Sequence, residues 1–145
     1  MILDVGCGEA IKGDVNLDLN IDSSMHRGSK LNVKKIPNFV LADAQHLPFK
    51  SACFEKVRSS HVIEHVPKPM LMLQEMTRVS SRYILIRCPH RFNLKIHRNE
   101  SHRNKFGCGW FKQAFGILHC SLVHNDVRSS LFGFPEEIMV KAEKL

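Results

Sequence analysis

Glycine and aspartate residues in the first third of the chain could form a binding site for a nucleoside. Gly6 and Gly8 directly follow a short apolar run, and glycine there lets the backbone approach a ligand closely. Asp18 lies at the end of the second apolar run, and Asp43 directly follows the third. A carboxylate at Asp18 can accept two hydrogen bonds from a ribose diol, and one at Asp43 can accept from an adenine amino group. Three such features at successive strand ends predict one pocket at the carboxyl edge of a parallel sheet.

The spacing of these residues disfavours a dinucleotide as the ligand. A dinucleotide-binding turn has the pattern G-x-G-x-x-G, with an acid roughly 20 residues later. Here Ile11 occupies the third glycine position, and Asp18 comes too early. A ligand that contains adenosine but no pyrophosphate therefore fits the pattern better.

Short apolar runs bounded by turn residues predict the strands that would position this pocket. The predicted strands are residues 1–5, 15–19, 39–42, 54–59, 83–86, 118–123 and 137–142, and the predicted helices are residues 67–79 and 110–115. Strands that alternate with helical or irregular crossovers indicate an α/β fold with a mostly parallel, Rossmann-like sheet. The last two strands have no helix between them, which predicts an antiparallel edge.

The first crossover of this sheet is unusually short. About half a dozen residues separate Gly8 from the second strand, whereas a parallel crossover normally needs a dozen or more. We therefore expect a reduced fold in which the first crossover helix is short or absent. The length of 145 residues indicates one domain, spanning residues 1–145.

The composition favours a cytoplasmic protein. No apolar stretch is long enough to span a membrane. The five cysteines are an odd number without a C-x-x-C pair, which argues against a disulfide framework. Basic residues are concentrated in residues 87–112, which contain seven Lys or Arg and three His but only one acidic residue, Glu100. The net charge favours an acidic substrate or partner. The basic segment itself is interpreted as solvated loops or a rim that faces the substrate, and a nucleic-acid surface is the alternative.

Four segments resemble the S-adenosylmethionine motifs of class I methyltransferases, most closely those of the type 11 branch. They read ILDVGCG at residues 2–8, NLD at 16–18, LADAQHLPF at 41–49 and SSHVIEHV at 59–66. The resemblance covers roughly residues 1 to 90 and implies S-adenosylmethionine as the cofactor. The cofactor-binding residues that it implies are Asp4, Gly6, Cys7, Gly8, Asp18, Leu19, Asp43, Ala44, Ser60 and His61.

The resemblance also assigns parts of the cofactor to parts of the chain. It implies that residues 6–8 line the methionine portion, with Asp4 bracing the loop from below. Asp18 would hold the ribose hydroxyls, and Asp43 with Ala44 the adenine edge. The resemblance also implies an N-terminal helix that helps to cover the cofactor, and we expect no counterpart of it. We therefore expect a more open pocket, or one that a second copy or a partner chain covers.

Methyl transfer requires no obligatory catalytic residue, because the cofactor supplies the reactivity and the protein aligns the reactants. A base is needed only for an acceptor that must lose a proton. His61, His65 and His90 are the candidates near the predicted carboxyl edge, and partly buried or helix-capping histidines are the alternative interpretation.

The second half of the chain contains many side chains that could bind a metal. They are His90, His97, His102, Cys108, His119, Cys120 and His124. Their spacing matches no recognised ligand pattern, so the sequence predicts no metal site.

Two functions from different classes follow. The first is S-adenosylmethionine-dependent methyl transfer to an acceptor that the sequence does not identify. The alternative is a methyltransferase fold without catalysis that binds nucleic acid or a protein partner through its basic segment. A third arrangement is a catalytic subunit whose pocket is completed by a partner.

Overall fold

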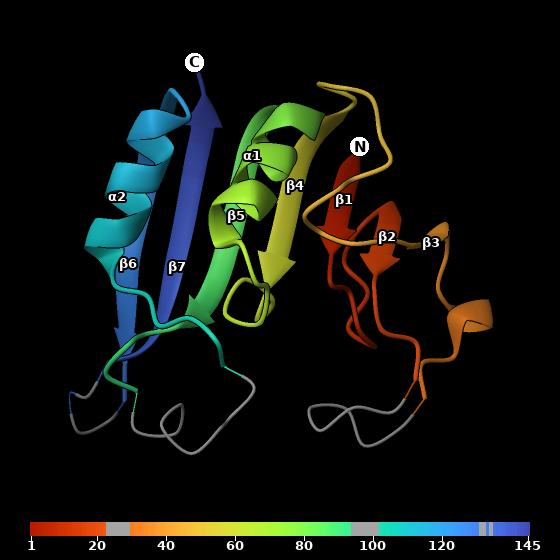
Figure 1. The fold of residues 1–145 in the computed structure, drawn as a ribbon, viewed down its shortest axis with the longest axis horizontal. Coiled ribbons are helices and arrows are strands. Elements are labelled where there is room, and N and C mark those ends of the chain that lie inside the picture. The colour runs from red at the N-terminus through yellow and green to blue at the C-terminus, as the bar shows by residue number, and fades with distance from the viewer. Residues whose placement is uncertain (23–29, 94–101, 131–132, 134) are drawn as a thin grey trace.

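The computed structural model describes residues 1–22, 30–93, 102–130, 133 and 135–145 (Figure 1). Its strands form one sheet with the order β3-β2-β1-β4-β5-β7-β6. In chain order they are β1 (Ile2–Val5), β2 (Val15–Asp18), β3 (Phe39–Leu41), β4 (Phe54–Ser60), β5 (Ser80–Pro89), β6 (Cys120–Ser129) and β7 (Pro135–Lys144). The described helices are α1 (Pro69–Val79), α2 (Cys108–Ile117) and the short 3-10 helix η1 (Val33–Lys35).

The first five strands run parallel, as the sequence predicts. β1 pairs with both β2 and β4, β2 pairs with β3, and β4 pairs with β5. The chain leaves β1 toward one side of the sheet for β2 and returns to the other side for β4. The strand order therefore reverses at β1, and ligands of open α/β sheets bind beyond the strand ends at such a point.

The antiparallel edge is also confirmed, although its strands are longer than predicted. β7 lies between β5 and β6 and is antiparallel to both. The sequence predicts residues 118–123 and 137–142, whereas the strands extend over Cys120–Ser129 and Pro135–Lys144. Most of β6 is exposed and polar, so its ends are set by backbone pairing with β7, which an apolar pattern does not record.

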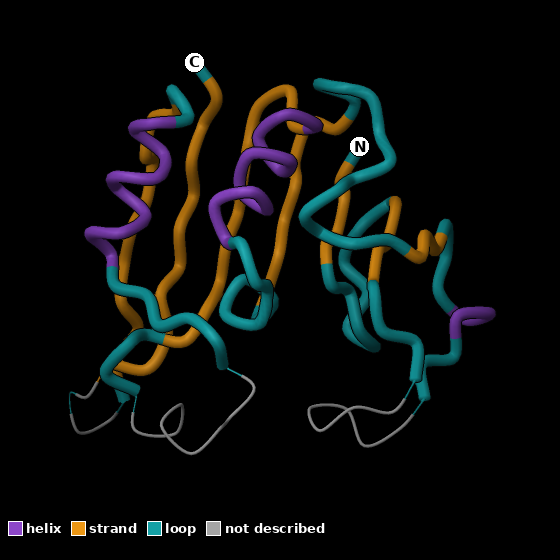
Figure 2. Tube along the Cα trace, in the orientation of Figure 1, coloured by secondary structure: helices purple, strands orange, loops and turns teal. Residues whose placement is uncertain are grey.

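Both α-helices cover the same face of the sheet (Figures 1 and 2). α1 buries Met72 and Met76, which are one helical turn apart, and α2 buries Phe111 and Phe115 at the same spacing. Alternate residues of β5, including Ile84, lie in the same core cluster. Within the described residues, α1 is thus the α-helix that covers the parallel half of the sheet.

The connection from β1 to β2 contains no helix, which confirms the prediction of a reduced fold. Gly13 closes this connection against the first strand. A Cβ atom at Gly13 would lie 2.5 Å from the Val15 carbonyl oxygen and 2.8 Å from the Asp4 nitrogen. The tight return therefore requires glycine at this position. Asp14 fixes the start of β2, because its carboxylate accepts a 2.7 Å hydrogen bond from the Ile2 amide.

No helix among the described residues combines the length and the apolar character that crossing a membrane requires.

The five cysteines are free thiols. Their surroundings differ, and we expect the order in which they react to follow their exposure. Cys53 is exposed, whereas Cys7, Cys88 and Cys120 are buried. Burial raises the pKa of Cys88, and nearby Glu64 and Glu137 raise it further. Because the thiolate is the reactive form, we expect a disulfide reagent at neutral pH to modify Cys53 first and Cys88 only after unfolding. Mass spectrometry of the labelled peptides measures this order, and early labelling of Cys88 would contradict the described packing.

Candidate functional site

A cavity of about 540 Å³ opens beyond the carboxyl ends of β1, β2, β3 and β4. Four segments that follow these strands line it. The lining residues are Gly6, Gly8, Glu9 and Ala10 after β1, Leu17 to Asn20 at β2, Ala42 to Gln45 after β3, and His61, Val62 and His65 to Pro67 after β4. The glycine and aspartate positions that the sequence selects therefore share one cavity.

The loop after β1 is held in a conformation that favours glycine. Gly6 and Gly8 have φ values of 72° and 52°, in the left-handed region. The Gly6 amide donates a 2.7 Å hydrogen bond to the Leu17 carbonyl, which ties the loop to β2. A Cβ atom at Gly6 would lie 2.2 Å from Val62 Cγ2, whereas one at Gly8 would meet no atom within 4 Å. Gly6 is packed against the wall of the cavity, and Gly8 borders its open space.

Asp18 stands at the end of β2 with its carboxylate fixed by two backbone amides. The Gly8 amide donates to Oδ2 at 3.0 Å, and the Asn20 amide donates to Oδ1 at 2.9 Å. The carboxylate therefore joins the glycine loop to the end of the second strand. A carboxylate oxygen has two lone pairs, so both oxygens can also accept from a ligand.

Asp43 has an equivalent position after β3. Its Oδ1 accepts a 2.8 Å hydrogen bond from the Gln45 amide, and the Gln45 side chain donates to both oxygens. Partial burial opposes ionisation, but these hydrogen bonds and nearby His46 together hold the pKa of Asp43 below its ordinary value. Asp43 thus presents an ionised acceptor to the cavity. Gln45, which the sequence pattern does not indicate as a site residue, also lines the cavity, and its Oε1 accepts a 2.9 Å hydrogen bond from the Lys68 amide.

Asp4 lies beneath the glycine loop and does not line the cavity. Its carboxylate accepts a 3.1 Å hydrogen bond from the Lys12 amide and lies 3.3 Å from Arg58 Nε. Burial raises the pKa of Asp4, while Arg58 and the Lys12 amide act in the opposite direction. Asp4 therefore connects β1, the loop before β2, and β4.

His61 lies at the end of the cavity nearest β4, between two carboxylates. Its Nε2 is 2.8 Å from Glu137 Oε1, and its Nδ1 is 3.5 Å from Glu64 Oε1. Glu64 raises the pKa of His61, and Glu137 adds to this effect, while partial burial opposes it. The backbone of His61 has φ 55° and its amide donates to the Arg87 carbonyl at 2.9 Å. The contact with Glu137, a residue of β7, is not apparent from sequence.

Besides Asp4, three residues selected from the sequence lie outside the lining of the cavity. Cys7 is buried beside Leu31 and Ile36. Ser60 is the last residue of β4, where it pairs with Arg87. His90 is also buried, and its Nδ1 accepts a 3.2 Å hydrogen bond from the Phe92 amide. Of the three histidines considered as bases, the structure places His61 and His65 at the cavity.

The basic segment 87–112 is described in part. Arg87 forms an ion pair with Glu137, and the Arg91 guanidinium lies 4.8 Å from the centre of the Phe92 ring. Lys95 and Arg98 lie outside the described residues. Nucleic-acid binding through this segment stays a prediction.

The cavity suits an adenosine-containing ligand by the chemistry of its walls. Gly8 leaves space for close backbone approach, and Asp18 and Asp43 supply acceptors at two neighbouring strand ends. A mostly parallel sheet with the order 3-2-1-4-5-7-6 and this cavity at its carboxyl edge define a Rossmann-like fold with a nucleoside-sized ligand site.

The chain belongs to the methyltransferase domain family, whose model matches residues 3–82. No curated protein matches the chain. Among solved structures, an S-adenosylmethionine-dependent methyltransferase of Thermotoga maritima has a TM-score of 0.75 at 14% identity, with 99% of this chain and 82% of that chain covered. A methyltransferase of Methanosarcina mazei has a TM-score of 0.71 at 18% identity, with 99% and 92% covered.

A chain in the complex between the Haloferax volcanii Trm112 methyltransferase activator and a methyltransferase is also similar. Its TM-score is 0.68 at 13% identity, with 98% of this chain and 81% of that chain covered. These matches confirm the predicted fold class. Membership of the methyltransferase family confirms the expectation of S-adenosylmethionine as the cofactor of the class.

Proposed function

We propose that this chain binds S-adenosylmethionine in the cavity and transfers its methyl group to an acceptor that enters beside His61 and His65. The observation that carries the proposal is the position of the Asp18 carboxylate. It is oriented by the Gly8 and Asn20 amides at the carboxyl end of β2, next to the open space beyond Gly8. Family membership supports methyl transfer as the reaction.

Each wall of the cavity then has a role. Asp18 accepts hydrogen bonds from the ribose hydroxyls, and the loop at Gly6 and Gly8 holds the methionine portion against the backbone. Asp43 and Gln45 contact the adenine edge, with Leu19 and Ala44 as apolar neighbours. Asp4 stabilises the loop from below, through its contact with the Lys12 amide.

The bound cofactor supplies a methyl group on a positively charged sulfur, which an acceptor displaces in line. The residues of the chain contribute the alignment of the two reactants, which in well-oriented reactions can lower the barrier by as much as ~7–11 kcal/mol. An acceptor that loses a proton on methylation also needs a base. His61 and His65 are the imidazoles that line the cavity among the described residues.

Calorimetry with two ligands tests the cofactor assignment. We expect S-adenosylhomocysteine to bind with one site per chain and NAD to show no measurable heat, because the loop lacks the third glycine of a dinucleotide turn. Binding of S-adenosylhomocysteine by the folded protein supports the proposal. Absence of that binding, or preference for NAD, overturns it.

The proposal extends to a partner chain that covers the open side of the cavity. The similarity to a chain of the Trm112 complex supports this arrangement. A second copy of this chain could take the same place. Size-exclusion chromatography with light scattering, with and without S-adenosylhomocysteine, distinguishes a monomer from a self-associated form.

A further inference from the structure

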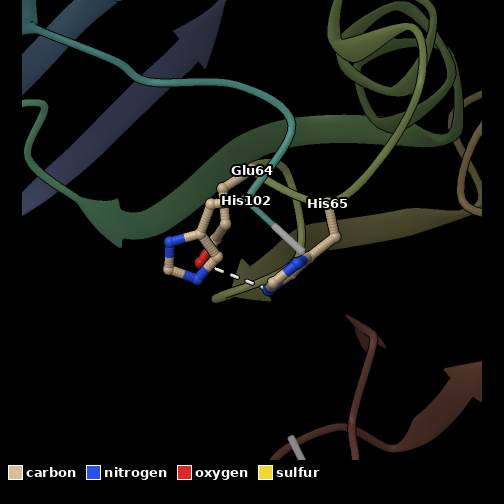
Figure 3. Close-up of side chains that lie close together, drawn as sticks. All are labelled: Glu64, His65 and His102. Atoms are coloured by element: carbon tan, nitrogen blue, oxygen red, sulfur yellow. Dashed lines mark ion pairs between the residues drawn. The ribbon is translucent and has the colours of Figure 1, made fainter. Parts of the chain in front are cut away.

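Three potential metal ligands from two segments meet at the end of the cavity near β4 (Figure 3). Glu64 and His65 belong to the turn after β4, and His102 belongs to the segment before α2. One ligand atom from each lies within 4.8 Å of the others. Glu64 Oε1 is 3.9 Å from His65 Nε2, and the two imidazole rings have centroids 4.8 Å apart.

The buried Glu64 carboxylate has the surroundings in which a bound cation would be stabilising. Its residue is 2% exposed, and neither carboxylate oxygen accepts a hydrogen bond from the described residues. A buried carboxylate without such bonds is costly unless it is paired or bound to a metal. His61 faces it at 3.5 Å but lies closer to Glu137, at 2.8 Å. The described basic neighbours of the Glu64 carboxylate are therefore two histidines, His61 at 3.5 Å, which it shares with Glu137, and His65 at 3.9 Å.

The two segments are joined independently of any ion. The Asn104 amide donates to the Glu64 carbonyl at 3.0 Å, and the Asn104 side chain donates to the Val66 carbonyl at 2.8 Å. These bonds hold His102, two residues away, beside Glu64 and His65. The ligand set is thus positioned by the fold, as a metal site requires.

We propose that Glu64, His65 and His102 bind one divalent transition-metal ion, with Zn²⁺ as the representative. Two imidazoles and one carboxylate form the ligand set of catalytic zinc and non-haem iron sites, which leave a position open. The nitrogen ligands disfavour Mg²⁺ and Ca²⁺, which prefer oxygen. Tetrahedral Zn²⁺ needs ligand atoms about 3.4 Å apart, so side-chain rotations that shorten the 4.8 Å spread by about 1.4 Å complete the site.

The position of this ion beside the cavity suggests that it activates the methyl acceptor. This inference rests on the proposed function. His65 lines the cavity while Glu64 is buried behind it, so an open coordination position would face the acceptor. A hydroxyl bound to a divalent metal loses its proton to solvent more readily. Its oxygen then forms the bond to the methyl carbon as the carbon–sulfur bond breaks, which releases S-adenosylhomocysteine. The acceptor class is therefore an oxygen nucleophile.

Zinc titration of the folded protein tests the site, with Co²⁺ absorption as a second readout of the ligands. The experiment uses a Cys53→Ser background to remove the exposed thiol. We expect one Zn²⁺ to bind per chain. Loss of an outer-shell partner lowers metal affinity by roughly 10- to 100-fold, so His102→Ala, which removes a direct ligand, should lower the Zn²⁺ affinity by at least as much. Glu64→Gln should act in the same direction while preserving side-chain shape.

The matched control is His124→Ala, which removes an exposed histidine that also lies 3.1 Å from a carboxylate, Asp126. It should leave Zn²⁺ affinity unchanged. No Zn²⁺ uptake by the parent protein, or equal affinity after His102→Ala in a sample with native near-ultraviolet circular dichroism, overturns the metal site. Binding of S-adenosylhomocysteine in the presence of a chelator is measured separately, so failure of the metal site and failure of the cofactor proposal give different results.

Discussion

Replacement of Asp18 by alanine should remove most of the affinity for S-adenosylhomocysteine while the sheet stays folded. The substitution removes the acceptor proposed for the ribose hydroxyls and also the carboxylate that receives the Gly8 and Asn20 amides. Hydrogen bonds to a charged group contribute about 1.5–3 kcal/mol each. Loss of two such bonds to the ligand weakens binding on the order of a hundredfold or more, since about 1.4 kcal/mol corresponds to a factor of ten. Calorimetric titration measures the change.

Two further variants separate ligand contact from loss of charge in general. Asp126→Ala removes an exposed carboxylate of β6, outside the residues that line the cavity, and should leave affinity unchanged. Asp18→Asn keeps one oxygen acceptor and should retain part of the affinity. If Asp18→Ala binds as well as the parent protein, the cofactor lies elsewhere.

The parallel half of the fold and its cavity follow from local features of the sequence. Buried strands appear as short apolar runs, and the residues after them must meet at one edge because parallel strands end on the same side. Gly8, Asp18 and Asp43 share the cavity for this reason. The short connection before Asp18 likewise predicts that the first crossover helix is short or absent, because a parallel crossover normally needs a dozen or more residues.

The contacts made by β7 could not be predicted in the same way. Glu137 reaches His61 and Arg87 because β7 enters the sheet antiparallel to β5, in a register set by backbone hydrogen bonds. Nothing in the local pattern around Glu137 indicates that register. The polar outer strand β6 shows the same limit, since its ends follow its pairing with β7.

The cluster of Glu64, His65 and His102 illustrates a second limit. Motif spacing identifies metal ligands only where they are close in sequence or follow a recognised pattern. His102 reaches Glu64 through a segment that Asn104 ties to the turn after β4. The sequence therefore predicts no metal, whereas the arrangement of the side chains supports the site proposed above.

The strongest test of the loop geometry is Gly6→Ala, for which we expect a loss of both stability and cofactor affinity. Gly6 has φ 72°, and a left-handed conformation costs a non-glycine residue about 1–3 kcal/mol. The added Cβ would also stand 2.2 Å from Val62 Cγ2, and overpacking typically costs a further ~1–3 kcal/mol. Chemical denaturation should show a decrease of about 2–6 kcal/mol in the free energy of unfolding.

The combination of Gly6→Ala with Val62→Ala separates these two causes. The double variant removes the collision but keeps the unfavourable backbone angle, so it should be more stable than the two single changes predict by addition. Gly116→Ala is the matched control. It places a Cβ in open space near the end of α2 and should be neutral or stabilising by up to ~1 kcal/mol. If Gly6→Ala has the same free energy of unfolding as Gly116→Ala, the loop after β1 does not hold a left-handed turn packed against Val62, and it does not form the described wall of the cavity.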